Sequence, residues 1–258
     1  MKVLLLFAAL FLVSQQQRPA STTGQLKDFT LTVTTPQKTY LEFQPIPIVI
    51  SLKNETNRPL MGHSLFNFSA AYLRLYVHRD DGLEELTRST MIADTVGDHR
   101  EFRPGEEAKK TECLMVRLGK AFPKPGKYQL TAELRSLDGT PPVFSKPFEV
   151  EIVAPEGLDA EALKFIRANS DPDYFFTGLH RRSQIIELSI VENFLALYGE
   201  SAYGNDATLL LGHIQYAKRQ YREARATFQK LANKPGYPFA SEAAKYLQYA
   251  DRELERQR

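Results

Sequence analysis

The hydrophobic pattern of this chain changes its period once, near Pro155, and that change limits what the chain can fold into. Before it, apolar and polar residues alternate, as in residues 29–34; after it, apolar residues recur every three or four positions, as in residues 188–198. A period of 2 predicts strands, and a period near 3.6 predicts amphipathic helices. We therefore expect a multidomain β plus α protein, strand-rich over residues 25–153 and helical over residues 156–258.

The strand-rich part is divided into short alternating segments by turn signals. Pro104-Gly105 and Pro125-Gly126 are turn dipeptides, and Asp80-Asp81-Gly82 predicts a hairpin turn. About eight such strands over roughly 130 residues are typical of an immunoglobulin-like antiparallel β-sandwich. The pattern therefore predicts that architecture for residues 25–153.

Three motifs in this part carry a resemblance to known families. They are the stretch from Tyr40 to Asn54, the segment Phe102-Arg103-Pro104-Gly105-Glu106, and the segment from Pro125 to Ala132. Together they resemble the intracellular proteinase inhibitor type of domain and its exported relatives. The resemblance implies an immunoglobulin-like fold. It also implies an alternative function, as a protease-inhibitor-like or substrate-presenting accessory of an exported enzyme.

This chain departs from that family at one place. The Gly-Glu pair usual before the first Pro of the family motif is replaced here by Phe43-Gln44. No inhibitory loop can be carried over residue by residue, so inhibition stays the alternative.

The helical part contains an internal repeat. Phe194 and Phe228 are 34 residues apart, as are Leu197 and Leu231. A helix-pair period of 34 residues is the length of a tetratricopeptide repeat, and a generic helical bundle is the alternative. The predicted helices carry the apolar sets around Leu163, residues 188–198, Leu210 to Ala217, Tyr221 to Leu231, and Ala243 to Leu254, with a break at Asp171-Pro172-Asp173.

The stretch from Leu211-Gly212 through Tyr221 and Ala224 to Phe228 has the tetratricopeptide offsets. It resembles the repeat region of bacterial envelope proteins such as the TolA-binding and outer-membrane assembly families. In such repeats the first helix of each pair lines a concave groove. The resemblance therefore implies four partner-binding positions: Asp206, Leu209, His213 and Tyr216. The alternative is that Leu209 and Tyr216 are ordinary core residues and that His213 is a solvated surface residue.

The N-terminus has the order of a secretory signal peptide. Lys2 precedes an unbroken apolar run from Val3 to Val13, and polar residues follow at Ser14. The run is about half the length that a membrane-spanning helix needs. We expect residues 1–20 to be a signal peptide, with no integral membrane span after its removal.

The number and position of the cysteines indicate in which cellular compartment the protein is expected. No cysteine follows the apolar run, so a lipoprotein is not expected, and Cys113 in an apolar stretch is predicted to be a buried thiol. Exported eukaryotic domains often rely on disulfides, which one cysteine cannot form within the chain. We therefore expect a bacterial periplasmic or cell-surface protein.

The net charge of the chain argues against nucleic-acid binding. The net charge is +2, and it comes from Lys2 and Arg18, because acidic and basic residues are equal in number in both later parts. A nucleic-acid-binding protein normally carries a basic excess, so no nucleic-acid partner is expected.

No motif for catalysis or for cofactor binding is present. The five histidines form no metal-binding pair, and there is no glycine-rich phosphate loop. We therefore expect no cofactor, no metal and no enzyme. The expected function is a non-enzymatic, exported interaction or scaffold protein of the bacterial cell envelope that binds protein or peptide partners.

Overall fold

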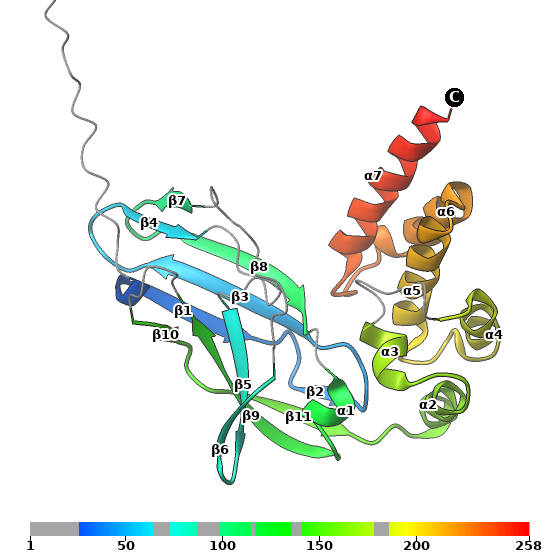
Figure 1. Ribbon diagram of the computed structural model, residues 1–258, viewed down its shortest axis with the longest axis horizontal. Coiled ribbons are helices and arrows are strands. Elements are labelled where there is room, and N and C mark those ends of the chain that lie inside the picture. Colours follow the sequence, from blue (N-terminus) through cyan, green and yellow to red (C-terminus); the bar gives the residue numbers. More distant parts are fainter. Residues whose placement is uncertain are drawn as a thin grey trace, which may run out of the picture.

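A computed structural model describes residues 26–63, 73–86, 99–114, 117–135, 141–177 and 186–257 of the chain. It has a strand region up to residue 153 and a helical region from residue 157, which lie next to each other (Figure 1). The signal peptide predicted at residues 1–20 lies outside the described residues. The predicted combination of antiparallel sheets with helices is confirmed.

Among its described residues, the strand region holds three sheets. One sheet has the order β1-β3-β8, a second has the order β2-β11-β9-β5-β6 with β10 beside β9, and β4 pairs with β7. All pairs are antiparallel except β2 with β11. The strands are β1 (Phe29–Thr34), β2 (Thr39–Leu41), β3 (Pro47–Asn54), β4 (Leu60–His63), β5 (Leu73–Arg79), β6 (Gly82–Glu85), β7 (His99–Phe102), β8 (Glu107–Cys113), β9 (Gly126–Leu134), β10 (Val143–Phe144) and β11 (Phe148–Val153).

The alternation in the sequence becomes two faces of each sheet. In β1 the apolar residues are buried and the threonines between them are exposed. The inward residues of the two larger sheets form one continuous apolar core, which includes Leu31, Ile50, Leu75, Leu130 and Val150. Burial of these side chains is the main favourable term that holds the sheets together.

The helices are α1 (Leu118–Ala121), α2 (Gly157–Asn169), α3 (Pro172–Thr177), α4 (Leu188–Tyr198), α5 (Gly204–Ala217), α6 (Tyr221–Ala232) and α7 (Ala240–Arg256). At the predicted break at Asp171-Pro172-Asp173, two residues, Ser170 and Asp171, separate α2 from α3. Asp171 accepts a hydrogen bond from the backbone N–H of Asp173, and Pro172 begins α3 at the position that suits proline. The sequence pattern therefore located the end of α2 but missed α3 and the short α1.

Helices α5, α6 and α7 pack in succession. Gly212 of α5 faces Phe228 of α6 so closely that a Cβ atom on Gly212 would lie 2.6 Å from the ring. Ala224 is fully buried on the same side of α6. Small residues at both positions therefore let α5 and α6 approach each other, as the sequence pattern predicts.

Side chains of the strand region contribute to the core of the helical region. Cys113 at the end of β8 belongs to the apolar cluster of the helices, and Leu41 and Phe43 pack against it. Tyr203 donates a hydrogen bond of 2.8 Å to the carbonyl oxygen of Glu42, and Asp173 accepts one of 3.1 Å from the N–H of Gly119. The two regions are thus joined by buried apolar contacts and by hydrogen bonds.

Candidate binding site on the helices

The four residues predicted to line a groove lie along α5, but three of them are buried. The exposed fraction of the side chain is 5% for Asp206, 0% for Leu209 and 6% for His213, whereas Tyr216 is half-buried. The expected open groove is therefore absent at the first three positions. The placement of Leu209 agrees with the alternative of ordinary core, and a solvated His213 is wrong.

Part of the reason is that the chain covers this face of α5 with its own residues. Burial raises the pKa of the Cys113 thiol well above its ordinary value, and the nearby carboxylates of Asp206 and Glu242 raise it further. Cys113 at the end of β8 therefore lies close to both α5 and α7. No partner can occupy the same space while the strand region is packed there.

Asp206 is held in this buried layer by a tyrosine. The hydroxyl of Tyr237 donates a hydrogen bond of 3.0 Å to Oδ1 of Asp206. Burial and the charges of Asp206 and Glu242 raise the pKa of Tyr237, so the hydroxyl stays protonated and remains a donor. This contact is structural, because it leaves no exposed polar group for a partner.

His213 joins α5 to α7. Its ring packs edge-on against Tyr246 at 4.3 Å between centroids and against Phe228 at 5.3 Å. Its Nε2 lies 3.3 Å from Oε1 of Glu242. Residue spacing along α5 does not indicate this role, because the partners of His213 come from two other helices.

Tyr216 belongs to a set of half-buried tyrosines that we call the tyrosine face: Tyr216, Tyr221, Tyr246 and Tyr249. Tyr216 contacts Tyr221 at 5.3 Å and Tyr246 at 5.8 Å, and Tyr246 contacts Tyr249 at 5.5 Å, all edge-on. Each ring is held by its neighbours, so the face is pre-ordered before any partner arrives.

The tyrosine face lies where the end of α5, the start of α6 and the middle of α7 meet. The sequence pattern placed Tyr221 and Tyr246 among the apolar positions of their helices and did not single out Tyr249. The density of tyrosines along the sequence could have indicated the site, since four of the chain's 12 tyrosines fall within residues 216–221 and 246–249. Their mutual contact depends on how α7 packs on α5, which sequence spacing does not give.

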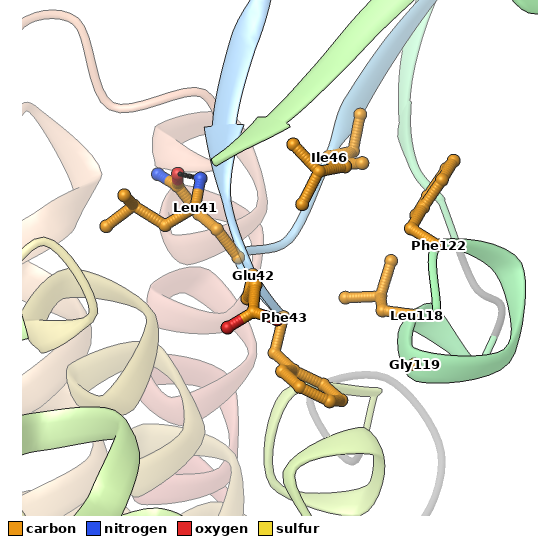
Figure 2. A pocket seen from close by; sticks show the side chains of 9 residues that line it. Leu41, Glu42, Phe43, Ile46, Leu118, Gly119 and Phe122 are labelled. Carbon is orange, nitrogen blue, oxygen red and sulfur yellow. Dashed lines mark hydrogen bonds between the residues drawn. The ribbon is translucent and has the colours of Figure 1, made fainter. Parts of the chain in front are cut away.

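Apart from the tyrosine face, a recess lies at the junction of the strand region and the helical region. Its empty volume is about 220 Å³, including the part open to solvent. In Figure 2, Leu41, Glu42 and Phe43 lie along one wall, and Leu118, Gly119 and Phe122 lie along the other. The recess is mainly apolar and shallow, and it has no set of converging polar groups of the kind that a small-molecule site needs.

Within the ranges that the structure describes, no three His, Cys, Asp or Glu side chains are grouped so that they could hold a metal ion. In the same ranges, no helix combines the length and the apolar character needed to cross a bilayer.

Comparisons with known proteins add no family. No protein-family model matches the chain, and no curated protein matches it. Among solved structures, a β-glucosidase from Listeria innocua in complex with glucose aligns at a TM-score of 0.28 and 13% identity, over 48% of this chain and 16% of that one. A CARDB domain from Pyrococcus furiosus aligns at 0.28 and 13%, over 50% of this chain and 94% of the domain.

A β-glucosidase from Erythrobacter marinus aligns at a TM-score of 0.27 and 12% identity, over 48% of this chain and 15% of that one. The chain thus spans less than a fifth of the length of the enzymes it aligns with. At TM-scores under 0.3, neither the enzymes nor the CARDB domain says anything about the function of this protein.

Proposed function

We propose that this protein is a non-enzymatic interaction or scaffold protein that is exported to the bacterial cell envelope and binds protein partners. The observation that carries the proposal is the tyrosine face, where four half-buried rings form a pre-ordered surface at one end of the helical region. Tyrosine is enriched at protein interfaces because a rigid ring supplies contact area at low entropy cost and the hydroxyl supplies a hydrogen bond.

In this proposal the strand region is an immunoglobulin-like β-sandwich. The shared core between the β1-β3-β8 sheet and the sheet that contains β5, β9 and β11 supports that architecture. Its role would be to hold the helices through the contacts of Cys113, Glu42 and Phe43 described above.

In the same proposal the helical region is tetratricopeptide-like. The packing of α5 on α6 and of α6 on α7, and the contact between Gly212 and Phe228, support this. Because Asp206, Leu209 and His213 are buried, the partner would bind at the C-terminal end of α5, around Tyr216, and not at these three positions.

Export is the first testable part. The lysine and the apolar run at the N-terminus predict processing by signal peptidase. N-terminal sequencing of the protein from its native envelope should give a start between about residues 15 and 25. A mature protein that retains Met1 would contradict export by this route.

Partner binding is tested by removal of two tyrosines. We expect the double variant Tyr216→Ala, Tyr249→Ala to lose partners that the wild type recovers after crosslinking in the native envelope, since both rings leave the face. His213 is not mutated, because it is buried and its removal would disturb the packing of the helices as well as any binding. Circular dichroism and thermal melting check that the variant is folded.

The matched control is Leu83→Ala, which removes an apolar side chain that is 52% exposed on β6. It should leave partner recovery unchanged. Equal recovery by the tyrosine variant and the wild type would remove the tyrosine face from consideration.

A further inference from the structure

Exposed basic residues lie close in the sequence to the tyrosines of the tyrosine face. Residues 216–225 and 245–257, which carry the face, hold seven basic and four acidic residues, a surplus of three. The whole chain has a net charge of only +2, so the surface charge next to the tyrosines is not the average of the molecule. The basic residues are Lys218, Arg219, Arg222, Arg225, Lys245, Arg252 and Arg256, and the acidic ones are Glu223, Asp251, Glu253 and Glu255.

Two of these acidic residues are already paired. Arg225 bonds Asp251 at 2.6 Å and ties α6 to α7, and Arg256 bonds Glu253 at 2.6 Å within α7. Lys245 lies over the ring of Tyr249, at 5.7 Å from its centroid.

Four of the cations have no ion pair with any described residue: Lys218, Arg219, Arg222 and Arg252. All four are exposed, and each lies within three residues of a tyrosine of the face. Lys218 and Arg219 lie between Tyr216 and Tyr221, Arg222 follows Tyr221, and Arg252 lies one helical turn after Tyr249. The face therefore combines ordered aromatic rings with a rim of unneutralised positive charge.

We propose that the tyrosine face binds an acidic peptide segment of a partner protein, whose Asp or Glu side chains pair with this rim while its apolar side chains contact the rings. The inference rests on the proposed function and names the chemistry of the partner. An arginine guanidinium group can donate two parallel hydrogen bonds to one carboxylate, and an exposed rim of cations speeds the encounter with a negatively charged partner.

The rim is too small for a general polyanion site. Three surplus charges release few counterions from a nucleic acid, and the helical region as a whole carries equal numbers of acidic and basic residues. The carboxylates of Asp251 and Glu253, which lie on the same stretch of α7 as Tyr249, would also repel a continuous phosphate backbone. A short acidic peptide can avoid these two carboxylates, because its charges are local.

The test is selection of a displayed library of random peptides, about twelve residues long, on the full chain. Selected peptides should be enriched in Asp and Glu over the starting library. A synthetic copy of one such peptide should bind the wild type at about 0.05 M salt and weaken as salt is raised. The double charge reversal Arg222→Glu, Arg252→Glu should weaken that binding by about tenfold or more.

The matched control is Lys124→Glu, which reverses an exposed charge in the strand region and should leave binding unchanged. Peptides that show no acidic enrichment, yet are lost in the Tyr216→Ala, Tyr249→Ala variant, would overturn the acidic partner and leave the proposed function standing. Selection that yields the same peptides on the wild type and on the tyrosine variant would overturn both. Binding of a single-stranded oligonucleotide as tightly as the peptide, with loss on charge reversal, would also overturn the peptide assignment.

Discussion

At the scale of single residues, burial decides what the chemically reactive groups can do. Cys113 is the one cysteine of the chain and is buried where β8 meets the helices. Desolvation raises its pKa, and the carboxylates of Asp206, Glu242 and Glu112 raise it further. The thiolate is the reactive form, so this environment disfavours a nucleophilic role and favours a packing role.

The reactivity of Cys113 gives a direct test. We expect iodoacetamide at pH 8 to label the native protein about a hundredfold or more slowly than the chain in guanidinium, since neither the thiolate nor access is available in the folded state. Mass spectrometry of the intact chain measures the label, and Cys113→Ser, which cannot be labelled, is the control. Fast labelling of the folded protein would show that β8 leaves the helices readily.

At the scale of elements, close approach between helices matters more than the propensity of each helix. Gly212 lies inside α5, where glycine costs about 1 kcal/mol relative to alanine. It is present because the ring of Phe228 fills the space that a side chain would need.

The variant Gly212→Ala distinguishes helix propensity from close packing against Phe228, because the two effects change the stability in opposite directions. Propensity alone predicts a gain in stability of about 1 kcal/mol, but overpacking against Phe228 costs about 1–3 kcal/mol. We expect a net loss of up to about 2 kcal/mol in the free energy of unfolding, measured by guanidinium denaturation. The control Ala226→Gly, at an exposed position of α6, should lose only about 1 kcal/mol through propensity. A Gly212→Ala variant more stable than the wild type would contradict the close contact.

At the scale of the whole molecule, the loop after β2 is one of the links that couple the two regions. Phe43 adopts a positive φ of 62°, which is unfavourable for a residue with a bulky side chain, and its ring packs against both apolar cores. Arg167 of α2 lies over the ring at 5.4 Å and pairs with Glu42 at 3.4 Å. The strained backbone is retained because these contacts hold it from both sides.

We therefore expect the wild type to unfold in one calorimetric transition and the variant Phe43→Ala to unfold earlier or in two steps. The loss in stability should be about 2 kcal/mol, below the value for a fully buried phenylalanine, because the ring is only partly buried. Phe144→Ala, which removes a ring that is 52% exposed on β10, is the control and should melt like the wild type. Identical melting of Phe43→Ala and the wild type would mean that the regions are independent.

The sequence by itself determined the change from strands to helices and the positions of the longer elements, but not the short helices α1 and α3. Alternation in residues 29–34 and three-four spacing in residues 188–198 follow from local geometry, so one buried face per element could be predicted. The spacing of Gly212 and Ala224 also indicated a close approach of α5 and α6, whereas the packing of Phe228 directly on Gly212 is seen only in the tertiary structure.

The tertiary structure alone decided which side of α5 is free. Asp206, Leu209 and His213 have the spacing of groove residues, yet they are covered in part by Cys113 of β8 and by Glu242 and Tyr246 of α7. Spacing along a helix defines a face but not its neighbour, since that neighbour comes from more than 25 residues away in the chain. The tyrosine face arises for the same physical reason: the packing that buries the inner end of α5 leaves Tyr216 at the edge, where rings from α6 and α7 meet it.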